Sequence, residues 1–598
     1  MDATLAALAQ KWLALDQNES TRAEIEGLIA ANDIAELQRR LGSNIKFGTA
    51  GLRAAMEAGF SRMNGVTVIQ ASQGLAAYIE RTVPNAKERG VVVGHDHRHN
   101  SETFARLTAA VFLTFGFKVY FYRSLVHTPM VPFAIKHLNL AGGVMITASH
   151  NPKADNGYKV YWENSAQIIP PHDAGIAAEI TARNDTVLTW DVTLVDTHPN
   201  CINDQTEILK DAYFSTIKDL IATPPSVIAE TKLQYVYTPM HGVGFPFAER
   251  VLKTFGMPEA VAVPEQVQPD PEFSTVAFPN PEEKGALNLA IALAESKNIG
   301  LVLANDPDAD RFAVAEKKAD GSGWHIFTGD QIGTLLGYAL VLKMKDKTAE
   351  EKKRVAMVNR PSVPRCYVWM SNRVVDLAKE GYDTFFAYEE AIGFMTHDCV
   401  LDKDGVTALA SFVELAILQK EKGSNMYELL EELYSKYGFH ASDNYYFICH
   451  EPKVIAKIFE RIRFDGIHRT NFKRASDGAI LRYPLTVAGF PVTYIRDLTV
   501  GFQMSDIPSF VSQHQNSDVE IKEGENVPTL PVSSSSEMIT FELANEVVFT
   551  LRTSGTEPKI KYYIEKKGTD RDAVRTDLSA VVKAVGDELF EASKNNLK

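Results

Sequence analysis

The sequence predicts an α/β protein of several domains, built on parallel or mixed β-sheets. From residue 65 onward, short apolar runs with the length of buried strands alternate with amphipathic helical segments. Several of these runs, such as residues 142–146 and 300–304, lead directly into polar loops. Open α/β sheets bind ligands at the carboxyl ends of their strands, so these loops are where function is expected.

The length of the chain supports several cores. With 598 residues, the chain has room for about four domains of ~150 residues each. Blocks of strand, helix and polar loop repeat in pattern, though not in sequence identity. We predict four domains, at residues 1–215, 216–323, 324–450 and 451–598.

Local patterns predict the individual elements. Residues 1–45 have helical periodicity and predict two amphipathic helices. Ser101 is the predicted N-cap of the helix after the strand at 91–96, and Thr328 begins another helix. Further strands are predicted at 117–122, 142–146, 233–237, 300–304, 312–315, 383–388, 491–495 and 546–551, and further helices at 286–294, 406–419 and 572–588.

Composition and charge exclude several classes of protein. The chain is 45% hydrophobic and 23% charged, which is typical of soluble globular domains. Its formal net charge of −14 argues against nonspecific binding to nucleic acid or to an anionic membrane. The four cysteines (Cys201, Cys366, Cys399 and Cys449) have neither metal-site nor disulfide spacing, which is typical of a reducing compartment. With no signal-peptide pattern and no transmembrane run, a cytoplasmic protein is predicted.

Ser149 lies on the tight polar loop that follows the predicted strand at 142–146. A lone serine in such a place is most often a turn or cap residue, and that interpretation stays open. The loop is not the nucleophile elbow of an α/β-hydrolase, because Thr147 and Asn151 stand where glycines are required. His150 is the better candidate for orienting chemistry than His95, His97 and His99, which we interpret as structural or phosphate-proximal. Asn156-Gly157 predicts a turn before the next strand.

Three aspartates alternate in the loop after the strand at 300–304: Asp306, Asp308 and Asp310. This concentrates hard oxygen ligands and suits Mg²⁺. An EF-hand is excluded, since Arg311 replaces its invariant glycine and Lys317 its bidentate glutamate. A solvated acidic turn is the remaining alternative.

Two further loops are rich in groups that bind anions. Residues 47–53 combine two glycines with a single arginine, Arg53, so backbone amides and a guanidinium could face an anion. The second loop offers hydroxyl, amide and basic donors for a phosphate from Arg552, Ser554, Gly555, Thr556 and Lys559. An ordinary turn is the alternative for each. Glu389 and Glu390 end a predicted strand and are candidates for binding sugar hydroxyls, or are plain surface carboxylates.

A serine, a three-aspartate loop, a phosphate-binding loop and paired glutamates together indicate phosphoryl transfer to and from serine, assisted by Mg²⁺. In this order they resemble the α-D-phosphohexomutase superfamily over nearly the whole chain. The matching motifs are TASHNP (Thr147–Pro152), NGYK (Asn156–Lys159), DPDADR (Asp306–Arg311), EEAIG (Glu389–Gly393), KDG (Lys403–Gly405) and RTSGTEPK (Arg552–Lys559). The residues in and around these motifs are most similar to the phosphopentomutase-like, or type 2 phosphoglucomutase, branch.

The resemblance implies a four-domain, heart-shaped molecule, with three related α/β mixed-sheet domains and a C-terminal α+β domain acting as a lid. It implies a phosphoserine at Ser149 and one Mg²⁺ per chain, held by that phosphate and by Asp306, Asp308 and Asp310. It places Arg53, His150 and Lys159 around the transfer, with Arg53 and Lys159 as candidates for general acid and base. The substrate-binding residues that it implies are Arg311, Glu389, Glu390, Lys403, Arg552, Ser554, Gly555, Thr556 and Lys559.

The implied reaction interconverts a sugar 1-phosphate and the terminal-carbon phosphate through a sugar bisphosphate, which also serves as activator. Two departures from the family bear on the substrate. Ala391 replaces a sugar-contacting serine, which favours ribose or deoxyribose phosphate over a hexose phosphate. Residues 360–368, with two prolines in a short span, stand where relatives have a helix and a sugar-binding loop. We expect that about one helix and that loop are missing from the third domain.

Several functions remain open at this stage. Within the mutases, phosphoglucomutase and sugar-bisphosphate synthase are alternatives to phosphopentomutase. A metal-dependent phosphatase would use the same serine and aspartates, and a catalytically weak sugar-phosphate-binding protein could result from the shortened third domain. The expected partners are small-molecule sugar phosphates, with no nucleic acid or membrane, and the expected state is a monomer or weak dimer.

Overall fold

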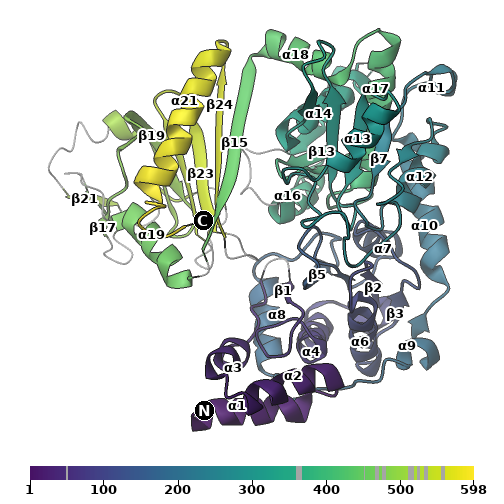
Figure 1. Ribbon diagram of the computed structural model, residues 1–598, viewed down its shortest axis with the longest axis vertical. Coiled ribbons are helices and arrows are strands. Elements are labelled where there is room, and N and C mark those ends of the chain that lie inside the picture. Colours follow the sequence, from purple (N-terminus) through teal and green to yellow (C-terminus); the bar gives the residue numbers. More distant parts are fainter. Residues whose placement is uncertain are drawn as a thin grey trace. The chain divides into compact units, whose positions relative to one another are not determined.

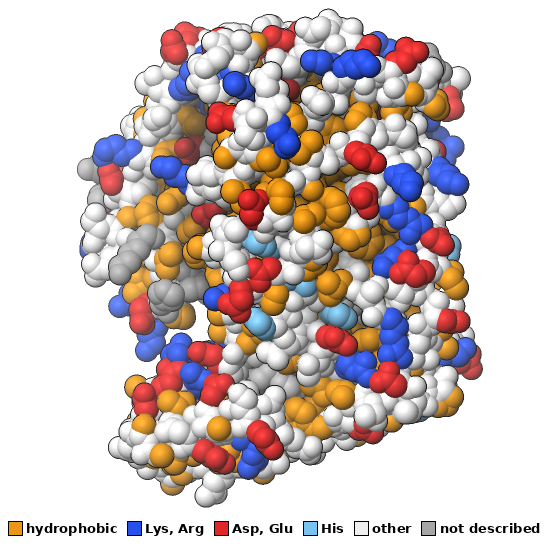
Figure 2. Space-filling view, turned by 45° about the vertical axis from the view of Figure 1, so that its right-hand side comes forward, with side chains coloured by type: hydrophobic (Ala, Val, Ile, Leu, Met, Phe, Trp, Pro, Cys, Tyr) orange, Lys and Arg blue, Asp and Glu red, His pale blue; other side chains and the backbone are white. Residues whose placement is uncertain are grey.

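The computed structural model describes two compact units, residues 1–429 (the N-terminal unit) and 430–598 (the C-terminal unit), each presented by itself (Figure 1). The described residues are 1–48, 51–345, 347–358, 367–449, 451–464, 471–474, 480–509, 518–521, 525–528, 530, 532, 537–553 and 559–597. Among them, no helix combines the length and apolar character needed to cross a membrane. On the face shown in Figure 2, acidic and basic side chains are interspersed.

The described residues of the N-terminal unit form three separate sheets. The first has the order β1 (Leu52–Ala55), β5 (Asp155–Trp162), β4 (Gly142–Ile146), β2 (Val91–His95), β3 (Val119–Phe121), β6 (Cys201–Ile202). The second has the order β11 (Trp324–Ile326), β10 (Phe312–Lys317), β9 (Leu301–Asn305), β7 (Val236–Thr238), β8 (Val261–Ala262). The third has the order β12 (Val355–Val358), β13 (Asp383–Glu389), β14 (Gly393–Met395). The predicted mixed-sheet α/β class is confirmed.

One strand arrangement recurs in all three sheets. β4, β9 and β13 each have a parallel neighbour on one side, namely β2, β7 and β12. Each then turns back into an antiparallel partner, β5, β10 or β14. The predicted functional loops around Ser149, Asp306 and Glu389 lie at these three turns. Both ends of each loop are therefore fixed in the same sheet.

Helices cover the sheets of this unit. Those of the first sheet include α4 (Gly65–Thr82), α6 (Ser101–Thr114), α7 (Met130–Leu138) and α8 (His172–Thr181). α12 (Phe245–Thr254), α13 (Asn288–Ser296), α14 (Gly329–Lys343), α16 (Tyr367–Lys379) and α17 (Gly405–Glu421) accompany the other two. Other helices in the described part of this unit are α5 (Ala86–Arg89), α9 (Leu194–Thr197), α10 (Gln205–Thr216), η1 (Ile217–Asp219), α11 (Pro225–Glu230) and α15 (Ala349–Lys353). Thr328 caps α14 through a capping box with Gln331, as its position predicted.

Three sequence-based expectations about local structure are wrong. Residues 1–45 form three helices, α1 (Ala3–Leu15), α2 (Glu19–Ala30) and α3 (Ile34–Leu41), because Asn18 and Asp33 each cap a new helix. Ser101 does not cap α6 but lies inside it, and its hydroxyl donates to Asp96. Asn156-Gly157 lies within β5 rather than in a turn. A Cβ on Gly157 would come within 2.5 Å of the Thr147 carbonyl oxygen, so close strand packing requires this glycine.

The C-terminal unit is built on an antiparallel sheet of seven strands (Figure 1). Its order is β15 (Phe439–Ile448), β24 (Lys559–Gly568), β23 (Val548–Thr553), β22 (Met538–Leu543), β19 (Phe490–Asp497), β18 (Thr486–Val487), with β20 (Phe502–Ser505) paired to β19. α21 (Arg571–Ala584), followed by a π-helical turn at Val585–Leu589, packs on β24 and β15, and α19 (Pro452–Phe464) packs near β17. A small sheet contains β16 (Asn471–Arg474), β17 (Ile480–Leu481) and β21 (Asp518–Ile521). The core of this unit includes the fully buried, stacked rings of Phe541 and Phe549.

The expected shortening at residues 360–368 falls almost entirely outside the described residues, since α16 begins at Tyr367. The third sheet has three strands in the described part of the chain, with β12 at one edge. The shortening therefore stays a prediction.

Glu316 in β10 links the second sheet to α18 (Met426–Tyr437). Its two carboxylate oxygens accept the backbone N–H groups of Met426 at 3.2 Å and Tyr427 at 2.7 Å. Burial raises the pKa of Glu316 from its ordinary 4.5 to about 7. Between these pH values the native chain keeps a proton that the unfolded chain has lost. The free energy of unfolding therefore falls as pH rises through this window.

We expect Glu316→Gln, which cannot ionise, to remove this decline. Relative to wild type, the free energy of unfolding of the variant should increase by about 3 kcal/mol between about pH 4.5 and about pH 7.5. Urea unfolding at several pH values, followed by tryptophan fluorescence, measures this change, because all five tryptophans lie in the N-terminal unit. The exposed Glu350→Gln variant is the control. A difference that stays constant with pH would contradict the prediction.

Candidate active site

Ser149 lies in the turn between β4 and β5 and is almost fully buried. Its φ of +53° is in the left-handed region, which is unfavourable for a residue with a side chain. In this conformation its hydroxyl donates to Asp306 Oδ2 at 2.9 Å, and its oxygen lies 3.4 Å from His150 Nδ1. If Ser149 were only a turn residue, its contact with Asp306, in the loop after β9 of the second sheet, would have no explanation.

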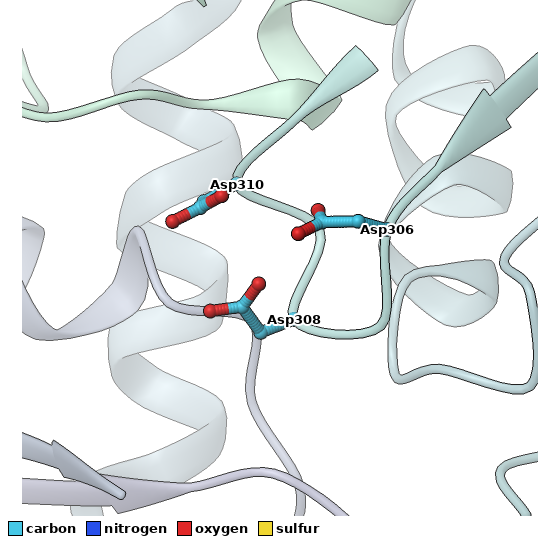
Figure 3. Close-up of side chains that lie close together, drawn as sticks. All are labelled: Asp306, Asp308 and Asp310. Atoms are coloured by element: carbon cyan, nitrogen blue, oxygen red, sulfur yellow. The ribbon is translucent and has the colours of Figure 1, made fainter. Parts of the chain in front are cut away.

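The three aspartates predicted to bind a metal lie together in the loop after β9 (Figure 3). Their carboxylates point toward one another, with one oxygen of each within 4.8 Å of the others. All three side chains are buried, so the alternative of a solvated acidic turn is wrong. Among the described residues, Oδ1 of Asp308 and Oδ1 of Asp310 have no hydrogen-bond partner. Buried, unused carboxylate oxygens at this spacing fit a hard divalent cation.

The loop that carries the aspartates is fixed by backbone bonds to all three sheet regions. The N–H of Thr128 donates to the Asp308 carbonyl oxygen at 3.0 Å, and its hydroxyl donates to Asp308 Oδ2 at 2.5 Å. The N–H of Gly405 donates to the Ala309 carbonyl oxygen at 3.1 Å. The N–H of Val243 donates to the Pro307 carbonyl oxygen at 2.8 Å. The candidate metal loop is thus a shared attachment point within the N-terminal unit.

Lys159 in β5 completes the ionic cluster. Its ammonium group donates to Asp308 Oδ2 at 2.6 Å and to Asp310 Oδ2 at 2.8 Å. Burial, helped by the neighbouring carboxylates, raises the pKa of Asp306 well above its ordinary value. Burial also acts to raise the pKa of Asp308, but the nearby Lys159 ammonium outweighs it and lowers that pKa. The same pairing raises the pKa of Lys159 despite its burial.

Two arginines predicted for the site lie beside this cluster. Arg53 in β1 pairs across the sheet with Gly157 and donates through Nη1 to Asn151 Oδ1 at 3.0 Å. Gly51, just before β1, has a φ of +94°, and a Cβ there would come within 1.9 Å of the Tyr158 carbonyl oxygen. Arg311 directs its backbone N–H to Asp306 Oδ1 at 3.0 Å, and its Nε lies 3.8 Å from Asp310 Oδ1.

The third sheet region contributes Glu389, Glu390 and Lys403. Glu390 is buried at the β13–β14 turn, so the alternative of a plain surface carboxylate is wrong for it. The Lys403 ammonium lies 3.5 Å from Asp310 Oδ2 and 3.3 Å from Asp402 Oδ1. Although burial opposes it, Asp310, Asp402 and Glu389 raise the pKa of Lys403. Lys403 therefore lies beside the aspartate loop, whereas the predicted binding of a sugar by Glu389 and Lys403 stays a prediction.

Comparison with known proteins supports one family. Two family profiles match: phosphoglucomutase/phosphomannomutase α/β/α domain I at residues 44–186 and domain II at residues 211–321. A probable phosphoribomutase of Schizosaccharomyces pombe is 43% identical over the full length of both chains. A human phosphopentomutase is 40% identical, in an alignment that covers all of this chain and 98% of the human protein. A human glucose 1,6-bisphosphate synthase is 38% identical, in an alignment that covers all of this chain and 96% of that protein.

The chain belongs to the phosphoglucomutase/phosphomannomutase family. The predicted resemblance to this family is confirmed, and so is the prediction that the chain is a sugar-phosphate mutase. Among solved structures, a putative phosphomannomutase from Thermus thermophilus matches with a TM-score of 0.60 at 19% identity, covering 91% of this chain and 98% of that one. This supports the fold alone. The alignment with the S. pombe protein spans 618 positions against 598 residues here, so at least 20 positions (618 − 598) have no counterpart in this chain.

The two ends of the RTSGTEPK motif, Arg552 and Lys559, belong to the C-terminal unit. Arg552 is in β23, and its Nη2 donates to the Tyr563 hydroxyl at 2.8 Å. Lys559 begins β24, and its Nζ lies 3.9 Å from the centre of the Tyr446 ring. Ser554, Gly555 and Thr556 lie outside the described residues. Their assignment stays a prediction.

Several residues that contact the candidate site were not predicted from the sequence. Thr128 contacts Asp308 as described above. Asp402 accepts from the Tyr161 hydroxyl at 2.7 Å and from Gln167 Nε2 at 2.8 Å, which places it next to Lys403. Arg98 contacts the backbone of the Ser149 loop. Only Asp402, adjacent to the KDG motif, carried a signal in the sequence.

Proposed function

We propose that the chain is a phosphopentomutase, which interconverts ribose or deoxyribose 1-phosphate and the 5-phosphate. The observation that carries the proposal is the buried contact of Ser149 Oγ with Asp306 Oδ2 at 2.9 Å. A hydroxyl at this distance from a three-carboxylate cluster is arranged for metal-assisted phosphoryl transfer. Relatives named phosphoribomutase and phosphopentomutase, at 43% and 40% identity over the full length of this chain, support the choice of sugar.

The buried aspartates fit one Mg²⁺ per chain, which Asp306, Asp308 and Asp310 would hold together with a phosphate on Ser149. When bound, the ion offsets the charge of the transferring phosphoryl group. Lys159 and Lys403 keep the aspartate cluster compact through their ammonium groups. Thr128 fixes the orientation of the Asp308 carboxylate.

In the first half-reaction, a sugar hydroxyl attacks the phosphorus on Ser149. The bond from phosphorus to Ser149 Oγ breaks, an acid protonates the departing serine oxygen, a base takes the proton of the sugar hydroxyl, and a sugar bisphosphate forms. In the second half-reaction, Ser149 Oγ attacks the other phosphoryl group, and the departing sugar oxygen regains a proton. Arg53 and Lys159 are the candidates for acid and base, and His150 for orienting the serine oxygen.

Substrate binding is assigned by the same family pattern. Glu389, Glu390, Lys403 and Arg311 would contact the sugar and its phosphate, and the loop with Arg552, Ser554, Gly555, Thr556 and Lys559 would bind the non-reacting phosphate. The proposal also includes four domains in a heart-shaped arrangement, at residues 1–215, 216–323, 324–450 and 451–598. It includes a monomeric or weakly dimeric state and a cytoplasmic location. A shortened third domain near 360–368 also belongs to this proposal, which places there part of the at least 20 alignment positions (618 − 598) that have no counterpart in this chain.

The test compares ribose 1-phosphate with glucose 1-phosphate as substrates of the purified chain, with Mg²⁺ and a trace of sugar bisphosphate. We expect a higher kcat/KM for the ribose compound, because Ala391 offers no hydroxyl to a hexose. Faster glucose turnover would support phosphoglucomutase instead. Net formation of a bisphosphate from the monophosphate, in a parallel assay that adds an acyl-phosphate donor, would support a synthase. Release of free phosphate without isomerised product would support a phosphatase. Absence of any turnover would support a binding protein.

A further inference from the structure

Arg98 lies in the loop after β2, outside the set of residues assigned to the reaction, and its side chain is fully buried. Its Nη2 donates to the carbonyl oxygens of Ser149 at 2.6 Å and Asn151 at 2.7 Å. Its Nη1 donates to the carbonyl oxygens of Pro152 at 2.9 Å and Asp155 at 3.3 Å. One guanidinium group therefore binds four carbonyls along the loop that carries the reactive serine.

The guanidinium is itself fixed from two sides. Asp96 Oδ2 lies 3.3 Å from Arg98 Nε, and Asp96 Oδ1 accepts the Arg98 backbone N–H at 3.0 Å and the Ser101 hydroxyl at 2.6 Å. On the other side, the guanidinium lies over the ring of Phe273, at 4.9 Å from the ring centre. Phe273 belongs to the segment between β8 and β9. Arg98 therefore has one orientation, determined by contacts from two parts of the unit.

The loop needs such support, because Ser149 has a backbone conformation that residues with side chains rarely adopt. The carbonyl of Ser149 itself is one of the four that Arg98 holds. A planar group with five fixed N–H donors can bind carbonyls in this divergent arrangement, whereas an ammonium group cannot bind all four at once. Releasing them would let Ser149 relax and move its Oγ away from Asp306.

We propose that Arg98 is a positioning residue for phosphoryl transfer, which holds the Ser149 loop in the conformation where the serine oxygen faces the aspartate cluster. Arg98 contacts neither substrate nor metal in this role. The inference rests on the proposed function, since it assumes that Ser149 carries the phosphoryl group.

The test is Arg98→Lys, compared with Arg89→Lys as a matched control. Arg89 also binds backbone carbonyls, those of Asn139 and Leu140, both at 2.9 Å, and pairs with Glu163, but it does not contact the Ser149 loop. Two rates are measured at saturating Mg²⁺: transfer of a radiolabelled phosphoryl group from glucose 1,6-bisphosphate to Ser149, and steady-state turnover. Amide hydrogen exchange of residues 147–156 is measured on the same proteins.

We expect Arg98→Lys to lower both the transfer rate and kcat by about 10- to 100-fold, because small displacements of a reacting group have effects of this size. KM for the sugar phosphate should change less than about threefold, and exchange in residues 147–156 should accelerate. Arg89→Lys should leave all of these quantities within about twofold. A loss of stability alone would lower the apparent kcat through the folded fraction, but the transfer rate per folded molecule, with the folded fraction measured by circular dichroism, would stay at the wild-type value.

Equal transfer rates in Arg98→Lys and wild type would overturn the inference, whatever the exchange data show. If Arg98→Lys does not fold, Asp96→Asn, which keeps the guanidinium but weakens its support, should lower the transfer rate in the same direction, and an unchanged rate there would also overturn it. Failure of the proposed function is seen separately, as absence of label on Ser149 in the wild-type protein. In that case the inference falls with it.

Discussion

Replacing Ser149 by alanine is expected to lower kcat for sugar-phosphate isomerisation by at least about 10⁴-fold, because Ser149 is the group proposed to carry the phosphoryl group between the half-reactions. The fold should persist. The substitution removes one buried oxygen whose described partners are Asp306 and His150, and alanine leaves the turn between β4 and β5 otherwise intact. The left-handed conformation at this position is equally available to both residues.

The measurement is turnover with Mg²⁺ and a trace of bisphosphate, together with mass spectrometry of the intact protein. Wild type should carry one phosphoryl group and the variant none. Ser72→Ala is the matched control, since Ser72 is also a fully buried serine of the first sheet region, bonded to the Tyr158 hydroxyl at 2.9 Å. It should keep both the phosphoryl group and activity within about threefold. Turnover above about 1% of wild type in Ser149→Ala would remove Ser149 from the mechanism.

Replacing Asp308 by asparagine should lower kcat on the order of 10³-fold and weaken Mg²⁺ binding, because a neutral amide is a poor ligand for a hard cation. Asp308 is central among the three aspartates. Its Oδ2 accepts from both Lys159 and Thr128, which leaves its Oδ1 for a metal. In the variant, the Lys159 ammonium would face an amide, and the remaining buried charges would be less well matched.

Titration with Mg²⁺, followed by activity and by calorimetry, separates the two effects. We expect the Mg²⁺ concentration for half-maximal activity to rise at least about tenfold. Asp16→Asn serves as the control, because Asp16 is a buried aspartate among the N-terminal helices and bonds to the Thr21 hydroxyl. It should affect stability but not the Mg²⁺ requirement. An unchanged requirement in Asp308→Asn would exclude the aspartate loop as the metal site.

The sequence allowed most of the candidate site residues to be proposed, because each lies directly after a recognisable buried strand. Asp306, Asp308 and Asp310 follow β9, and Ser149 follows β4, so local pattern and motif coincide. Their meeting in one place follows from the sheet arrangement rather than from any spacing in the sequence. That Ser149 Oγ and Asp306 Oδ2 would be hydrogen-bonded across 157 residues could not be read from either loop alone.

What the sequence did not reveal is the support around those residues. Arg98 contacts Ser149, which is 51 positions further along the chain, and Thr128 contacts Asp308, which is 180 positions further along. Neither Arg98 nor Thr128 belongs to a motif with a known chemical role. The Asn156-Gly157 pair was misjudged because turn propensity is local, whereas the close approach of Thr147 that requires Gly157 is a tertiary contact. The N-terminal helices were undercounted because Asn18 is a short cap inside a continuous periodic pattern.

The aspartate loop is bonded to segments of all three sheet regions, through Thr128, Val243 and Gly405. This has a consequence for how the enzyme could be divided or rebuilt. A fragment that contains only residues 216–323 would retain every aspartate of the loop but lose two of the donors that shape it, Thr128 and Gly405. Grafting that segment into another protein should therefore transfer the residues without the affinity for a cation. Recombination between relatives would have to exchange matching contact partners from all three regions together.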